Sequence, residues 1–145
     1  MSAFTNGGME RKRCQKRGAK VFYIDGAGSG PDGTGSGFGW VRPFTGKQRI
    51  TWIDGLTSNE AEYRGLLGVL KYVACGSCVL ILTDSQLVAN QFTGKFGVYE
   101  PRLRRLLDKA KTLVAEKELD VEVRWIRRTR NLAGCLMDRS ARPGA

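Results

Sequence analysis

The most restrictive feature of the sequence is the order of its hydrophobic patterns. Short apolar runs bounded by turn residues predict strands over 21–24, 38–41, 49–53, 79–82 and 121–126. Apolar residues at helical spacing predict helices over 59–74, 85–91, 101–117 and 131–140. Three consecutive strands followed by alternating helices and strands favour an α/β fold, in which helices pack on a mixed sheet.

The chain divides into a basic tail and one folded domain. Residues 1–20 contain six basic side chains and one acid, with little apolar periodicity, whereas 21–142 carries all the predicted elements. A length of 145 residues suits a single domain with a real core. The tail is expected to be either a solvated terminus or a nonspecific phosphate-binding arm.

Charge and composition limit the possible chemistry. There are 24 Lys and Arg residues against 14 Asp and Glu, a net charge of +10, which points to a polyanionic partner such as nucleic acid. The chain has no histidine, which excludes Ser-His-Asp catalysis, Cys-His catalysis and His-ligated zinc. Cys75 and Cys78 form the one Cys-x-x-Cys pair of the sequence, and no histidine completes a set of four zinc ligands, so a zinc site is not expected there.

The sequence predicts a cytoplasmic monomer. No apolar run approaches the roughly 20 residues of a membrane helix, and no apolar core of a signal peptide is found at the N-terminus. Four cysteines in a chain of this length are not typical of a secreted disulfide scaffold.

Three carboxylates stand at the boundaries of predicted elements. Asp25 is expected to end the first strand, Asp84 to end the buried fourth strand, and Glu62 to lie on the first turn of the first helix, 59–74. If the two strands are adjacent and parallel, both aspartates meet at one edge of the sheet. Carboxylates without histidine favour a hard cation, Mg²⁺ or Mn²⁺, although an aspartate cap and two surface acids would give the same pattern.

Four motifs around these residues resemble those of type 1 ribonuclease H. They are Tyr23-Ile24-Asp25-Gly26, Thr57 to Arg64 with its Glu60-Ala61-Glu62, Thr83 to Val88 with Asp84, and Arg128-Thr129-Arg130-Asn131. The motifs occur in order over roughly residues 20–141. The resemblance implies the ribonuclease H-like fold, a five-stranded mixed sheet with three antiparallel strands, two parallel strands and flanking helices.

The resemblance also implies an activity, namely metal-dependent endonucleolytic cleavage of the RNA strand in RNA–DNA hybrids. Two Mg²⁺ or Mn²⁺ ions would be held by Asp25, Glu62, Asp84 and a fourth ligand, and the products would carry 5′-phosphate and 3′-hydroxyl ends. The substrate-binding residues that it suggests are Gly26, Ala27, Gly28, Thr57, Ser58, Asn59, Arg128 and Arg130.

The sequence departs from the family pattern at two places. Only residues 93–100 separate the two middle helices, so the basic protrusion of many members is absent. The tail, Lys95 and the cluster of Arg102, Arg104 and Arg105 are then the candidates for gripping the hybrid. The loop before the last helix has no histidine, and Arg127, Arg128 or Arg130 are the candidates to replace it.

The fourth ligand position is a further departure from the family pattern. The family places an aspartate four residues after the asparagine, and here that position is Cys135. Asn131, Cys135 and Asp138 lie at i, i+4 and i+7 on one helical face. Small and apolar residues two, three and six positions later favour Asn131, and a thiol is a poor Mg²⁺ ligand. Asn131 is also a good N-cap, and the two roles are compatible.

Two other functions fit the same residues. One is a noncatalytic module on this fold that binds hybrids or double-stranded RNA, with a site decayed at its fourth ligand. The other is an integrase-like or exonuclease-like nuclease, against which the second-motif Glu62 and the Asn131 before the last helix argue. Double-stranded RNA is a further candidate partner of the enzyme itself.

Overall fold

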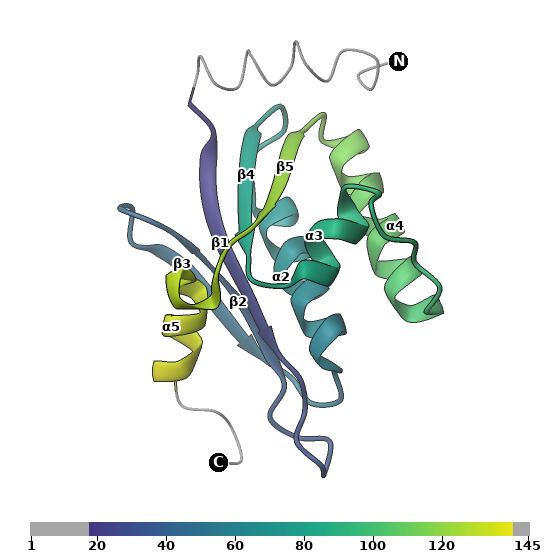
Figure 1. Ribbon diagram of the computed structural model, residues 1–145. Coiled ribbons are helices and arrows are strands. Elements are labelled where there is room, and N and C mark those ends of the chain that lie inside the picture. The colour runs from purple at the N-terminus through teal and green to yellow at the C-terminus, as the bar shows by residue number, and fades with distance from the viewer. Residues whose placement is uncertain (1–17, 141–145) are drawn as a thin grey trace.

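The computed structural model describes residues 18–140, which form one mixed sheet with helices on both faces (Figure 1). The strands are β1 (Lys20–Ala27), β2 (Gly37–Arg42), β3 (Lys47–Trp52), β4 (Cys78–Thr83) and β5 (Asp120–Trp125). The helices are α2 (Ser58–Tyr72), α3 (Gln86–Phe92), α4 (Pro101–Glu116) and α5 (Leu132–Arg139), with a short 3₁₀ turn η1 (Arg128–Arg130) before α5.

The sheet has the order β3-β2-β1-β4-β5. β1, β2 and β3 pair antiparallel, whereas β4 pairs parallel with both β1 and β5. The predicted five-stranded mixed sheet, with three antiparallel strands and two parallel ones, is therefore confirmed. Because β1 is central and β4 runs beside it in the same direction, residues near their carboxyl ends come together.

β1 is longer than the sequence pattern indicates at both ends. Lys20 already pairs with Val79, so it belongs to the sheet although the pattern places it in the tail. Asp25 was expected to end the strand, but it lies inside it and pairs with Gly39, and β1 continues to Ala27. The reason is the antiparallel partner β2, which keeps pairing past the last apolar residue. The rest of the predicted tail, residues 1–17, lies outside the described residues.

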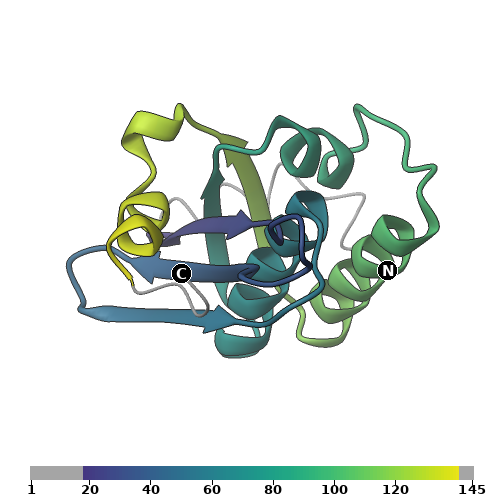
Figure 2. The ribbon, with the colours of Figure 1, turned by 90° about the horizontal axis from the view of Figure 1, so that it is seen from below.

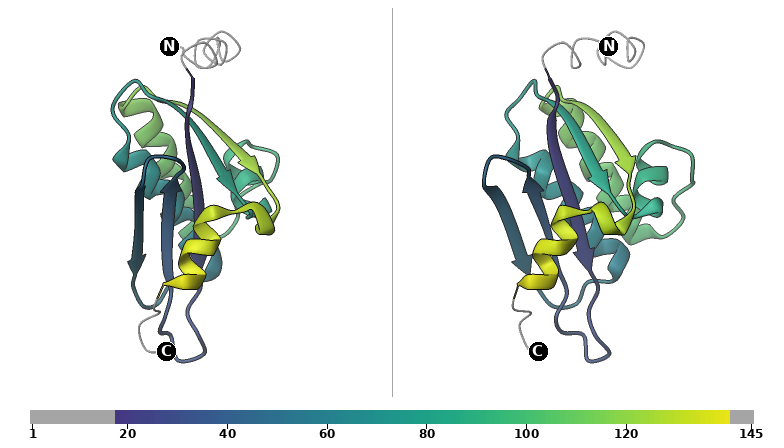
Figure 3. Two further views of the ribbon diagram at one scale, coloured as in Figure 1. Left: turned by 90° about the vertical axis from the view of Figure 1, so that its left-hand side faces the viewer. Right: turned by 60° about the vertical axis from the view of Figure 1, so that its left-hand side comes forward.

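The helices form two layers, as the two views in Figure 3 show. α2 packs against β1, β2 and α4 on one face of the sheet, and α5 lies against β1 and β2 on the other. The main core lies under α2 and includes Phe22, Ile24, Tyr63, Leu66 and Ile81. Along β1, side chains alternate between the two faces, so Ile24 enters this core and Asp25 points toward α5.

The helix ends follow local signals in the sequence. Thr57 caps α2 in a reciprocal capping box with Glu60, and Pro101 occupies the first turn of α4. α3 ends at Phe92 and α4 begins at Pro101, so the segment between them is as short as predicted and leaves no room for a protrusion. Between residues 18 and 140, no helix is both long and apolar enough to cross a membrane.

Candidate functional site

The three predicted carboxylates converge at one place. Asp25, Glu62 and Asp84 each offer an oxygen to a cluster whose atoms all lie within 4.8 Å of one another. β1 supplies Asp25, the residue after β4 supplies Asp84, and the first turns of α2 supply Glu62. The convergence expected from the sequence is therefore present, at the junction of two parallel strands and a helix start.

Gly26 lets α2 reach this cluster. A Cβ built at residue 26 would collide with the carbonyl carbon of Ala61 and lie 2.5 Å from the Glu62 nitrogen, both backbone atoms. Gly28 is as tightly placed, because a Cβ there would lie 2.6 Å from the Ser58 nitrogen. The two glycines therefore bring the start of α2 against β1, and this contact carries Glu62 to Asp25.

We expect Gly26→Ala to lower the free energy of unfolding by about 1–3 kcal/mol, since the added methyl group overpacks a backbone contact. It should also displace Glu62 and reduce activity. Gly30→Ala is the matched control, because its Cβ would meet no atom closer than 3.6 Å. Urea denaturation of both variants checks the prediction, and equal stability for the two would contradict it.

Asp25 and Glu62 are buried, and burial changes their protonation. Side-chain exposure is 2% for Asp25 and 9% for Asp84, and Glu62 is 8% exposed. Burial, followed by the charges of Asp25 and Asp84, raises the pKa of Glu62 to about 9. Burial, followed by the Asp84 charge, also raises the pKa of Asp25, against the opposing effect of Arg128. Without a cation, the site therefore favours holding a proton.

Glu62 also has an oxygen with no partner. Its Oε2 is buried and makes no hydrogen bond to any residue of the described chain. A buried carboxylate oxygen left unpaired is costly unless a proton or cation satisfies it. Together with the oxygen-only donor set, this atom shows that the cluster fits a hard divalent cation.

Arg128 of η1 already supplies one positive charge to the cluster. Its Nη1 lies 3.0 Å from Asp84 Oδ2 and 3.3 Å from Asp25 Oδ1, and its Nη2 lies 3.9 Å from Asp138 Oδ1. The Arg128 side chain remains 59% exposed, so it covers the cluster from the solvent side. The sequence suggested Arg128 as a substrate ligand; its contact with the carboxylates is an additional observation.

Asn131 is a buried cap in this structure. Its Oδ1 accepts hydrogen bonds from the N–H groups of Ala133 and Gly134, and its Nδ2 donates to the carbonyl of Ile24 at 2.8 Å. The side chain thus ties the start of α5 to β1, one residue before Asp25. Its oxygen would have to give up these two bonds to bind a metal, so the fourth-ligand role remains a prediction.

Replacing Asn131 tests its role as the cap of α5 separately from its predicted role as a metal ligand. Asn131→Ala is expected to lower the free energy of unfolding by about 2–4 kcal/mol, because the cap is removed and the Ile24 carbonyl is left buried without a donor. Asn131→Asp keeps the cap but turns a carboxylate toward that carbonyl, so it should also destabilise. Chemical denaturation measures both effects. If Asn131→Asp keeps its stability and raises activity, the residue serves as a metal ligand in addition to capping α5.

The other two candidates for a fourth ligand lie further away along α5. Cys135 is exposed, and Asp138 contacts Arg128 rather than the acid cluster. The α5 position that faces Asp25 most directly is Gly134, where a Cβ would lie 3.4 Å from Asp25 Oδ2. The sequence pattern placed Gly134 in a packed position, and only the helix register relative to β1 reveals that it faces the site.

The predicted substrate residues surround the cluster on two sides. Thr57, Ser58 and Asn59 begin α2, and Ala27 ends β1 beside them. The backbone of Ser29 donates to Leu56, which holds the glycine-rich loop against this helix start. Arg130 is exposed in η1 on the other side of Arg128. Free N–H groups at a helix start suit a phosphate, although Thr57 already binds the Glu60 N–H.

Comparison with known proteins places this fold and site in a family. The family model described as reverse transcriptase-like matches residues 28–135. The chain is also 35% identical over 106 residues to Ribonuclease HI of Halobacterium salinarum, covering 68% of this chain and 52% of that protein. The chain belongs to the type 1 ribonuclease H-like family. The match to Bifunctional protein Rv2228c of Mycobacterium tuberculosis is 36% identical over 97 residues, 61% of this chain and 26% of the relative.

Solved structures of this family share the whole described fold. RNase H1 from Halobacterium salinarum superposes with a TM-score of 0.69 at 26% identity, over 83% of this chain and 94% of that one. LC11-RNase H1, solved in complex with an RNA/DNA hybrid, gives a TM-score of 0.69 at 25% identity, over 81% and 91% of the two chains. The chain spans about a quarter to a half of the length of its curated relatives.

Proposed function

We propose that this member of the family is an endoribonuclease that cleaves the RNA strand of RNA–DNA hybrids. The observation that carries the proposal is the convergence of Asp25, Glu62 and Asp84, with an unpaired buried oxygen on Glu62, in a ribonuclease H-like fold. The basic composition of the chain and the hybrid bound to the LC11 relative support the choice of substrate.

Asp25, Glu62 and Asp84 are proposed to hold Mg²⁺ or Mn²⁺, two ions per site. When bound, the ions supply Lewis acidity at the scissile phosphate and lower the pKa of the attacking water, giving 5′-phosphate and 3′-hydroxyl ends. Asp25, whose carboxylate lies within 4.8 Å of the ligand atoms of both other acids, would take part in holding the ions. Asn131 is proposed as the fourth metal ligand, through the same side-chain oxygen that caps α5.

The remaining residues are proposed to bind and orient the hybrid. Thr57, Ser58 and Asn59 at the start of α2, with the backbone of Gly26 to Gly28, lie where a strand entering the cluster would pass. The contacts that a ribonuclease H must make to 2′-hydroxyl groups fall to these short polar residues and backbone groups. Arg128 and Arg130 are proposed to hold phosphates, and Arg128 would give up its contacts with Asp25 and Asp84 to do so.

The decisive experiment measures hydrolysis of a labelled RNA–DNA hybrid by the purified chain with Mg²⁺, with Mn²⁺ and with EDTA. Cleavage of the RNA strand that requires the metal supports the proposal. Binding of the hybrid without cleavage supports the noncatalytic module instead; among the described residues, the acid cluster includes no carboxylate from α5, which favours that module. Double-stranded RNA is tested in parallel as a second substrate. The monomeric state and the cytoplasmic location remain predictions.

The basic tail gives a separate prediction. Deleting residues 1–17 removes Arg11, Lys12, Arg13, Lys16 and Arg17 but spares β1. We expect weaker hybrid binding, and a salt dependence whose log–log slope falls by roughly 0.9 for each phosphate that the tail no longer neutralises. The turnover number at saturating substrate should change little. Titrating the affinity between about 50 and 200 mM salt checks this, and an unchanged slope would make the tail a passive terminus.

A further inference from the structure

A groove with basic walls lies between α2 and the β2–β3 hairpin, outside the site described above. It encloses about 310 Å³, and its walls carry Arg49 of β3 with Arg64 and Lys71 of α2. Trp40 pairs directly with Arg49 across the hairpin, so both side chains lie on the same face of the sheet. β3 is the outer strand of the sheet, beside β2 (Figure 2).

Trp40 of the groove and Asp25 of the carboxylate cluster point to opposite faces of the sheet. Trp40 contacts the core residue Phe22 on the α2 face, with ring centroids 5.4 Å apart. Asp25, by contrast, points toward Gly134 of α5 on the other face. A ligand in the groove would therefore not touch Asp25 or Asp84, and the two sites can be changed independently.

The cations of the groove are available to a ligand. Among residues 18–140, Arg49, Arg64 and Lys71 have no ion pair and no side-chain hydrogen bond, and no acid lines the groove. Glu60 lies one turn before Arg64 and attracts it electrostatically, but the two form no ion pair, and Glu60 Oε1 accepts a hydrogen bond from the Thr57 N–H. Arg64 and Lys71 stand two turns apart on α2, roughly 10 Å along the axis, so each would contact a different phosphate.

The floor of the groove is aromatic. Trp40 and Tyr72 lie with ring centroids 4.5 Å apart, and Tyr72 is 45% exposed. Gly68 keeps the floor open between Arg64 and Lys71, since even a Cβ there would lie 3.3 Å from Trp40 Cδ1. Cations spaced along an exposed aromatic surface are the usual means of binding single-stranded nucleic acid, in which phosphates meet the cations and a base stacks on a ring.

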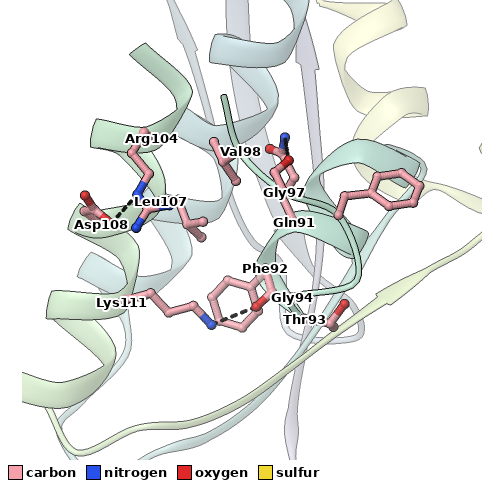
Figure 4. A pocket seen from close by; sticks show the side chains of 11 residues that line it. Gln91, Phe92, Thr93, Gly94, Gly97, Val98, Arg104, Leu107, Asp108 and Lys111 are labelled. Carbon is pink, nitrogen blue, oxygen red and sulfur yellow. Dashed lines mark hydrogen bonds and ion pairs between the residues drawn. The ribbon is translucent and has the colours of Figure 1, made fainter. Parts of the chain in front are cut away.

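A second hollow, between α3 and α4, differs from this groove in the state of its cations (Figure 4). Its cations already have partners inside the protein. Arg104 Nε lies 3.3 Å from Asp108 Oδ1, and Lys111 donates to the Phe92 carbonyl at 2.7 Å and lies over the Phe92 ring. That hollow therefore offers no free cation to an anion.

We propose that the groove between α2 and β3 is a second nucleic-acid site, which binds single-stranded DNA or RNA through its phosphodiester backbone and one stacked base. Arg49, Arg64 and Lys71 contact phosphates, and Tyr72 stacks on a base. The site goes beyond the proposed hybrid cleavage, because a strand can bind there without reaching the carboxylates. It gives the protein a second contact with a nucleic acid that has single-stranded segments next to a hybrid.

The test is fluorescence anisotropy with a labelled 12-nucleotide oligo-dT and the full chain in EDTA. The variant Arg64→Gln/Lys71→Gln should raise the dissociation constant at least fivefold and reduce the salt slope by about 1.4, or 0.7 for each cation. Tyr72→Ala should weaken binding about fivefold or more with an unchanged salt slope. The matched control, Lys109→Gln/Arg139→Gln, removes two exposed cations elsewhere and should change the affinity less than twofold.

Three results would overturn the proposal. They are equal weakening by the groove and control variants, unchanged binding in the groove variant, and equal competition by polyglutamate of the same charge. The basic tail is present in every variant, so its contribution cancels. Cleavage of a blunt hybrid should be unaffected by Arg64→Gln/Lys71→Gln, and Asp25→Asn should still bind oligo-dT. Loss of the hybrid activity would therefore leave the groove proposal standing, and the reverse also holds.

Discussion

Replacing Asp25 by Asn is expected to abolish hybrid cleavage while leaving the fold intact. Asp25 interacts with both Glu62 and Asp84, so its charge is proposed to support cation binding in the cluster. Metal-ion catalysis contributes several kcal/mol to stabilising the transition state. Because each 1.36 kcal/mol is tenfold in rate, the turnover number should fall by at least about a thousandfold.

The same substitution should stabilise the metal-free protein at neutral pH. Burial and the Asp84 charge raise the pKa of Asp25, so the ionised form is disfavoured in the folded state, and a neutral amide removes that cost. Arg128 keeps its bond to Asp84. Thermal unfolding in EDTA measures this effect, and Asp108→Asn, on the surface of α4, is the control for activity. Cleavage near the wild-type rate in Asp25→Asn would exclude the proposed site.

Much of the fold follows from local patterns. The strands and helices appear in the predicted order because each has its own periodicity, and Thr57 and Pro101 mark helix starts through their own chemistry. The convergence of Asp25 and Asp84 also follows, since it needs only two adjacent parallel strands. Glu62 could be placed because the first turn of a helix can face the sheet that it covers.

The parts that could not be predicted depend on pairings between distant residues. Asp25 lies inside β1 because β2 continues to pair with it, which the apolar pattern of β1 does not record. Arg128 reaches Asp25 from 103 residues away, and Asn131 caps α5 while binding the Ile24 carbonyl. Each of these contacts depends on how η1 and α5 lie on the sheet, whereas sequence spacing describes only the helix itself.

Glu62→Gln should reduce the pH dependence of the free energy of unfolding of the metal-free protein. The folded pKa of Glu62 is about 9, against an ordinary value of 4.5, so between these pH values the folded state holds a proton that the unfolded state has released. The free energy of unfolding therefore falls as the pH rises through this window, by up to about 1.4 kcal/mol per unit from this group. Asp25, whose pKa is also raised, adds to the fall at the acidic end.

This pH dependence of stability can be measured by comparing the wild type with Glu62→Gln, each with and without a divalent cation. In EDTA, thermal midpoints of the wild type should fall between about pH 5 and 9, and Glu62→Gln should be flatter and more stable at pH 8. Added Mg²⁺ or Mn²⁺ should restore the wild type at high pH, because a cation satisfies the ionised carboxylate, and should have little effect on the variant. If the thermal midpoints of the two proteins change equally with pH, Glu62 is not the buried carboxyl group that takes up a proton or a cation.

Glu60 supplies a control of opposite sign on the same helix. Its pKa is lowered, chiefly by the Thr57 N–H in the capping box, so its ionised form stabilises the folded state above the ordinary pKa and this contribution disappears as the pH falls. Glu60→Gln should therefore lower the free energy of unfolding at neutral pH, whereas Glu62→Gln should raise it. The two glutamates, two residues apart, would then differ in sign because Glu60 accepts the Thr57 N–H as part of the cap, whereas Glu62 lies beside two other carboxylates.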